Sequence, residues 1–170
     1  SGAIAELALI SDELLFVPSI NRHAYVVRMA DGSVVADFRA DDWLWTTPGV
    51  QGSKLFFGDF GGSVYGLNIT SSGVEQLWEP ASLKGERVRS GAAVVNGVIV
   101  VVDRKPVVTF IDANDGSILN TVPIEGAGTV RANLVVKDGA AYFSTTGGKL
   151  FRAEPASRRV VEVQLSGVKK

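Results

Sequence analysis

The chain has 170 residues, of which 46% are hydrophobic and 21% are charged, which is the composition of an ordinary globular protein. Its net charge of −1 argues against nucleic acid or an anionic membrane surface as its partner. It contains no cysteine, which excludes disulfides and thiolate metal sites, and no apolar run approaches the roughly 18 residues of a membrane span.

Short strands are predicted along the whole chain, because apolar runs alternate with turns rich in Gly, Asn, Asp and Ser. The first group of strands is expected at residues 4–9, 14–17, 23–28 and 34–38, and the second at 43–50, 54–58, 63–68 and 74–78. A surface loop is expected at 79–85. The third group is expected at 87–95, 98–103, 107–112 and 117–123, and the fourth at 129–136, 140–144, 149–154 and 160–165. No segment supports a helix of ordinary length.

The four groups are repeats of one another. In each, the third strand carries a small residue, an aromatic or β-branched residue and a short apolar run that ends on a polar residue, at Arg28, Asn68, Asp112 and Glu154. A period of about 42 residues that is filled with short strands predicts a β-propeller. We therefore expect an all-β fold, a single β-propeller domain over residues 1–170. Its four blades of four antiparallel strands would lie at about residues 3–40, 41–82, 83–126 and 127–168.

Blades of a propeller bury their faces only against neighbouring blades, so an open row of four would leave two faces uncovered. The sequence allows three solutions. The chain closes as a four-bladed ring, it forms half of an eight-bladed ring that a homodimer completes, or it is a piece of a longer propeller.

The second repeat carries a family resemblance. Residues 45–50 (WTTPGV), 54–58 (KLFFG) and 62–68 (GSVYGLN), followed by Gly73 and Trp78, resemble the repeat of the PQQ-like, quinoprotein-type β-propeller family. This resemblance implies a propeller fold, usually in rings of seven or eight blades, and the setting of bacterial envelope propeller proteins. The family's enzymes lock their blades with a Thr-Gly pair and a Trp, bind Ca²⁺ beside the cofactor, and in some cases use a vicinal disulfide. Here only the second repeat ends in Trp, and there is no cysteine. The resemblance thus implies the fold without the cofactor, and we expect no cofactor and no metal.

Alignment of the repeats suggests one candidate site. It matches Trp43 with Arg87, and Trp45 with Arg89 and Arg131, at the starts of the innermost strands. Such positions commonly face the central channel of a propeller or its mouth. Two guanidinium groups beside an indole would hold a carboxylate or a phosphate, because arginine offers a bidentate fork.

The competing interpretation of this cluster is structural. The side chains would then fill a narrow channel and pair with the nearby carboxylates of Asp41, Asp42 and Glu86. His23 is the only histidine, so neither a Ser-His-Asp triad nor a site of several histidines is available, and no catalytic residues are expected.

These observations favour a non-catalytic platform that binds a protein partner in an extracytoplasmic setting. One alternative is a quinoprotein-like domain that holds an anionic small molecule at Trp45, Arg89 and Arg131. Another is a structural module of a larger multidomain protein.

Overall fold

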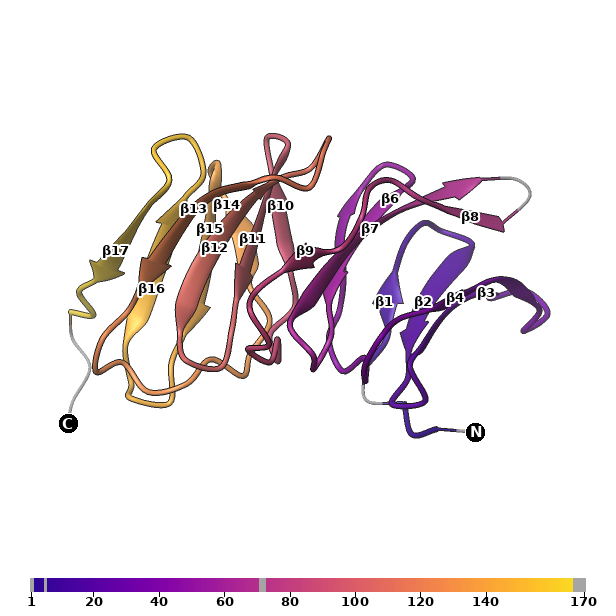
Figure 1. Ribbon diagram of the computed structural model, residues 1–170, viewed down its shortest axis with the longest axis horizontal. Helices are drawn as coiled ribbons and strands as arrows, with labels where there is room; N and C mark the ends of the chain where they lie inside the picture. Colours follow the sequence, from indigo (N-terminus) through magenta and orange to yellow (C-terminus); the bar gives the residue numbers. More distant parts are fainter. Residues whose placement is uncertain (1, 5, 71–72, 167–170) are drawn as a thin grey trace.

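The computed structural model describes residues 2–4, 6–70 and 73–166. Residues 1, 5, 71–72 and 167–170, which include parts of the predicted first, second and fourth blades, lie outside the described residues. The described residues form strands and turns without a helix, so no helix in that part of the chain is able to cross a membrane. The strands make four antiparallel sheets that stand side by side (Figure 1), and we call these sheets blades 1 to 4.

Each blade is a meander of four strands in which each strand pairs with the next one along the chain, and blade 2 has a fifth strand that pairs with its third. Blade 1 contains β1 (Ala8–Leu9), β2 (Leu14–Pro18), β3 (His23–Arg28) and β4 (Val34–Arg39). Blade 2 contains β5 (Gly49–Gln51), β6 (Lys54–Gly58), β7 (Ser63–Thr70), β8 (Gly73–Gln76) and the short β9 (Ala81–Ser82). Blade 3 contains β10 (Ala93–Val95), β11 (Val98–Val102), β12 (Val107–Asp112) and β13 (Ile118–Pro123). Blade 4 contains β14 (Val135–Lys137), β15 (Ala140–Ser144), β16 (Leu150–Glu154) and β17 (Arg159–Val163).

Turn chemistry explains the innermost hairpins. Asn96 and Gly97 have φ angles of 50° and 78°, and Asp138 and Gly139 have 49° and 73°. Two successive positive φ angles make the turn whose twist matches that of the flanking strands, and Asn-Gly and Asp-Gly tolerate them best. The predicted pairing of β10 with β11 and of β14 with β15 is therefore confirmed.

The hydrophobic core lies between consecutive blades. One cluster joins blades 1 and 2 and includes Phe16, Leu55 and Tyr65; a second joins blades 2 and 3 around Phe56 and Ile99; the third joins blades 3 and 4 around Phe110 and Phe143. Successive side chains of a strand point to opposite faces of the sheet, and blades 2 and 3 each have a neighbouring blade on both sides. Both faces of these two blades are therefore apolar. The four-blade prediction is confirmed.

The row of blades is open. Blades 1 and 4 lie at opposite ends of the molecule (Figure 1), and none of the core clusters among the described residues joins them. The closed four-bladed ring is therefore not the arrangement that the structure shows. At the inner edge, Asn133 Nδ2 donates a hydrogen bond of 2.9 Å to Glu6 Oε2, and Asn133 Oδ1 accepts one of 2.9 Å from Gly91 N. One amide thus connects the innermost segments of three blades.

The innermost strands are shorter than predicted. Of the predicted strand at residues 43–50, the ladder keeps only the end, as β5, and the same holds for β10 and β14. The missing pairing goes to the preceding blade, because Leu44 N donates to Ser19 O (3.3 Å) and Val88 N to Asp59 O (3.1 Å). These are contacts between repeats, which apolar patterns within one repeat do not report.

The predicted surface loop at 79–85 is also partly wrong. Its residues Ala81 and Ser82 form β9 on the edge of β7, and the side chains of Ala81 and Leu83 are each only 8% exposed. This segment therefore completes the outer edge of blade 2 and adds to the core between blades 2 and 3.

Trp78 fixes the contact between blades 2 and 3. Its Nε1 donates to the carbonyl of Ala113 in blade 3 at 3.3 Å, and its ring stacks on Phe56 with the centroids 6.5 Å apart. A Cβ at Gly66 would lie 2.5 Å from Trp78 Cζ2, and one at Gly116 would lie 2.6 Å from Trp78 Cδ2. Glycine at both positions is what lets the indole ring lie between the two blades.

Candidate functional site

The five residues predicted as a binding site come together in the structure. Two adjoining pockets, with volumes of about 440 Å³ and 230 Å³, share Trp43, Phe60 and Arg89 among their lining residues. Trp45 and Arg131 line the larger pocket, and Arg87 and Asp42 line the smaller one. We call the set formed by Trp43, Trp45, Phe60, Arg87, Arg89 and Arg131 the aromatic–arginine surface.

Alternation in the innermost segments directs these side chains outward. Leu44, Val88 and Val130 occupy equivalent positions and are 1%, 0% and 1% exposed. The residues on either side of them point the other way, because successive side chains of an extended chain face opposite sides. Trp43 and Trp45 are accordingly 47% and 44% exposed. The structure therefore brings together the residues that the repeat alignment matched.

Phe60, at the centre of this surface, was not predicted. Its ring centroid lies 6.1 Å from that of Trp43 and 5.9 Å from that of Trp45. The guanidinium carbons of Arg87 and Arg89 lie 5.9 Å and 5.1 Å from the same centroid, within the range of a cation–π contact. Phe60 belongs to the turn between β6 and β7, and its large apolar side chain in a Gly-rich turn was the signal that sequence reasoning passed over.

The arginines of this surface have no carboxylate partner in the part of the chain that the structure describes. No salt bridge within 4 Å involves Arg87, Arg89 or Arg131. Glu86 pairs with Lys105 instead, and Asp42 accepts a hydrogen bond from Trp43 N at 2.8 Å. Among the described residues, these arginines therefore do not form the ion pairs with Asp41, Asp42 or Glu86 that the structural interpretation expects.

A buried carboxylate holds the base of the surface in place. Asp59 is 0% exposed, and its two oxygens accept hydrogen bonds from Ser63 N (2.8 Å), Tyr65 Oη (2.9 Å) and Asp42 N (3.1 Å). Burial raises the pKa of the Tyr65 hydroxyl well above its usual value, so Tyr65 keeps the proton that it donates. These hydrogen bonds hold in place the turn that carries Phe60 and the segment that leads into Trp43 at Asp42.

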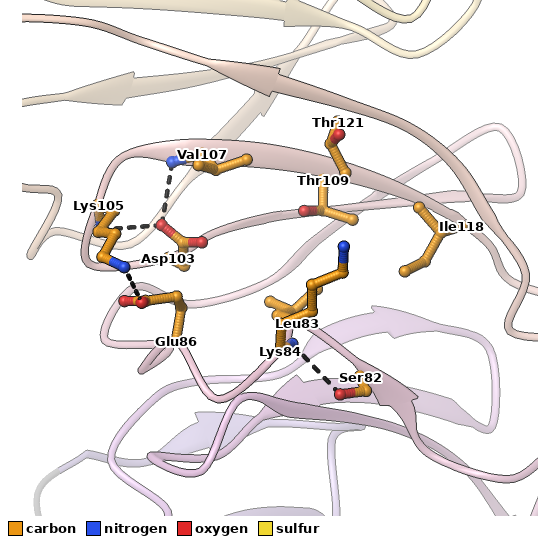
Figure 2. Close-up of a pocket in the computed structure, with 10 residues that line it drawn as sticks. All are labelled: Ser82, Leu83, Lys84, Glu86, Asp103, Lys105, Val107, Thr109, Ile118 and Thr121. Carbon is orange, nitrogen blue, oxygen red and sulfur yellow. Dashed lines mark hydrogen bonds and ion pairs between the residues drawn. The ribbon is translucent and has the colours of Figure 1, made fainter.

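A separate pocket, of about 370 Å³, lies between blades 2 and 3 (Figure 2). Glu86 and Lys105 form an ion pair at its edge, and Asp103 Oδ1 accepts hydrogen bonds from Lys105 N (2.8 Å) and Val107 N (3.0 Å). Burial is the main cause that raises the pKa of the Asp103 carboxyl. Figure 2 shows the Lys84 side chain pointing into this pocket, toward Thr109. Both acidic side chains that line this pocket, Glu86 and Asp103, therefore already have partners.

His23 does not form part of a catalytic constellation in the described structure. Its Nδ1 lies 2.6 Å from Asp37 Oδ1, and its ring stacks on that of Tyr25, which belongs to the same strand, β3 of blade 1. Among the described residues, no group of three or more His, Cys, Asp or Glu side chains is arranged to hold a metal ion.

The comparisons with known proteins agree with this fold. Residues 72–161 match the family model described as outer membrane protein assembly factor BamB. The crystal structure of BamB from Moraxella catarrhalis is similar with a TM-score of 0.74 and 14% identity, over 99% of this chain and 52% of that chain. The computationally designed Ika4 protein is similar with a TM-score of 0.72 and 18% identity, over 96% of this chain and 93% of that one. No curated protein matches the sequence.

These values show a β-propeller whose four blades span about half the length of the Moraxella BamB chain. The designed Ika4 chain, in contrast, is nearly the same length as this one.

Proposed function

This chain belongs to the family of the outer membrane protein assembly factor BamB, and from that premise we propose that it is a non-catalytic β-propeller platform that binds a protein partner. The observation that carries the proposal is the aromatic–arginine surface. Trp and Arg are residues that dominate the binding energy of protein interfaces, and here two exposed Trp side chains cluster with three Arg side chains. The buried carboxyl groups of Asp59 and Asp103 accept hydrogen bonds that stabilise turns, which supports a structural role for these two acidic residues.

The cellular setting that we propose is extracytoplasmic, in a bacterial envelope. The family's name supports this placement, since it describes a factor in outer membrane assembly. The absence of cysteine is compatible with any compartment.

Photo-crosslinking tests the platform. A photoreactive residue in place of Trp45 in the full chain should yield a discrete protein adduct in cells. A photoreactive residue in place of Asp12, an exposed turn residue of blade 1, is the control and should not yield that adduct. Adducts of the same size and yield from both positions, or none from position 45, would contradict protein binding at this surface.

A second candidate function uses the same surface for an anionic small molecule, as in a quinoprotein-like domain. Three arginines and three aromatic rings line the adjoining pockets of 440 Å³ and 230 Å³, and pockets of this size accommodate small ligands. Titration with inorganic phosphate and with pyrroloquinoline quinone, followed by tryptophan fluorescence, tests this candidate directly. Saturable binding of either compound would favour it over the protein platform.

We also propose that a second copy of the chain completes the ring, as a homodimer. On the free face of blade 1, Leu15 and Tyr25 occupy the repeat positions of Leu55 and Tyr65, which are buried against blade 1. Leu9 is 65% exposed beside Leu15, its partner in the ladder. This face therefore suits another blade of the same repeat, and blade 4 has the corresponding free face, with Val135 63% exposed. Two copies related by a two-fold axis would cover both faces of each.

Light scattering after size-exclusion chromatography measures this directly. We expect a species of twice the 18.0 kDa chain mass that persists on dilution, and we expect a Tyr25→Asp variant to remain folded at the mass of one chain. Wild-type chains that stay at 18.0 kDa throughout a concentration series would contradict completion by a second copy.

A further inference from the structure

We infer that the aromatic–arginine surface recognises an acidic segment of a protein, with partner carboxylates seated between Arg89 and Arg131; this inference rests on the protein-binding function proposed above. The larger pocket brings these two arginines together with Trp43, Trp45 and Phe60, although they come from different blades. The positive charge of this surface indicates which kind of ligand it binds.

The aromatic–arginine surface carries an excess of positive charge. Arg87, Arg89 and Arg131 have no carboxylate within 4 Å among the described residues, whereas Lys105, Lys149 and Arg152 each have one. Asp42, which lines the smaller pocket, is the acidic residue among those that line the two pockets, and its Oδ1 already accepts a hydrogen bond from Trp43 N. The surface thus presents three positive charges against one negative charge, which complements an acidic ligand.

Phe60 orients two of the guanidinium groups of this surface. The ring of Phe60 contacts the guanidinium groups of Arg87 and Arg89 without using any of their N–H groups. The Nε of Arg89 is buried and has no hydrogen-bond partner in the described part of the chain. A guanidinium that is already partly desolvated and held against a ring loses little freedom when a carboxylate binds it.

The shape of the surface favours a chain segment over a small ion. The two pockets adjoin through Trp43, Phe60 and Arg89, so together they extend across blades 2, 3 and 4. The exposed indoles of Trp43 and Trp45 offer apolar contact area that a small inorganic anion does not use. An extended segment that alternates acidic with aromatic or aliphatic residues uses both the charge and the rings.

An array of short blocked peptides tests the inference on the purified full chain, with tryptophan fluorescence as the readout. One series carries Asp and Glu among apolar residues, and its matched series carries Asn and Gln instead. We expect binding in the acidic series that weakens as salt is raised. We also expect at least about a tenfold loss of affinity in the double variant Arg89→Gln, Arg131→Gln. The control Arg159→Gln changes an exposed arginine of blade 4 and should leave the affinity unchanged.

Three outcomes would overturn the inference. They are equal binding of the acidic and amide series, no binding by any acidic peptide, and inorganic phosphate binding that competes fully with the peptides and matches their affinity. A specific crosslinked protein at position 45 together with a failed acidic series would reject the acidic partner and leave the platform standing. Failure of both experiments would reject both.

Discussion

Replacement of Asp59 by alanine is expected to lower the free energy of unfolding by about 3 kcal/mol or more. The substitution leaves the donors Ser63 N, Asp42 N and Tyr65 Oη without their acceptor in a site where Asp59 is 0% exposed. Each buried donor left unpaired costs about 1 to 3 kcal/mol, less where water reaches it. Chemical denaturation monitored by circular dichroism measures the loss.

A Tyr65→Phe variant is the matched control for this network. It keeps the ring in the core of blades 1 and 2 and removes the hydroxyl, which donates to Asp59 and accepts from Asp41 N at 2.9 Å. We expect a loss of about 1 to 2 kcal/mol, smaller than that of Asp59→Ala. Equal stability of wild type and Asp59→Ala would show that the network does not hold the turn that carries Phe60.

The second large effect is expected at Asp103, which occupies the repeat position of Asp59 in blade 3. Asp103→Ala removes the acceptor of Lys105 N and Val107 N and should cost about 1 to 3 kcal/mol. Asp103→Asn keeps an acceptor oxygen and removes the ionisable group. We expect this variant to be at least as stable as the wild type at neutral pH, because burial disfavours the charged carboxylate.

The dependence on pH has a definite sign. Because the pKa of Asp103 is raised in the folded protein, the folded state holds the proton more tightly than the unfolded chain does. This contribution to the free energy of unfolding is full below the ordinary value of 3.8, and it is lost as the pH rises from there through the raised pKa. Denaturation of wild type and Asp103→Asn between about pH 4 and pH 7 should therefore show the variant gaining on the wild type as the pH rises. A constant difference between the two would contradict a raised pKa of Asp103 in the folded protein.

The strands that follow local rules were predictable from the sequence. The predicted strands at residues 54–58, 107–112 and 140–144 coincide with β6, β12 and β15, because hairpin turns and alternation are properties of neighbouring residues. The innermost segments were not predictable to the same degree. Their N–H groups, such as Leu44 N, bond to the turn of the preceding blade, so their structure depends on contacts between repeats.

The sequence predicted which residues of the candidate site come together, but it did not predict all the contacts that these residues make. The repeat offsets placed Trp45, Arg89 and Arg131 at one mouth because equivalent positions of consecutive blades converge there. Phe60 was not predicted, because a residue in a turn is not part of the alternating apolar pattern that marks a strand. The ion pairs around the arginines were not predicted either. Glu86 is adjacent to Arg87 in the sequence, yet its carboxylate pairs with Lys105.

The sequence of contacts between blades sets how the molecule opens. Each core cluster joins a blade to its neighbour in the chain, so the middle blades are held from two sides and the end blades from one. Detaching blade 1 or blade 4 breaks one cluster, while opening blade 2 or blade 3 breaks two. Amide hydrogens will accordingly exchange with solvent fastest in β1–β4 and β14–β17 and slowest in the central blades. Local unfolding of the isolated chain thus proceeds inward from both ends, and anything that covers the end faces slows it.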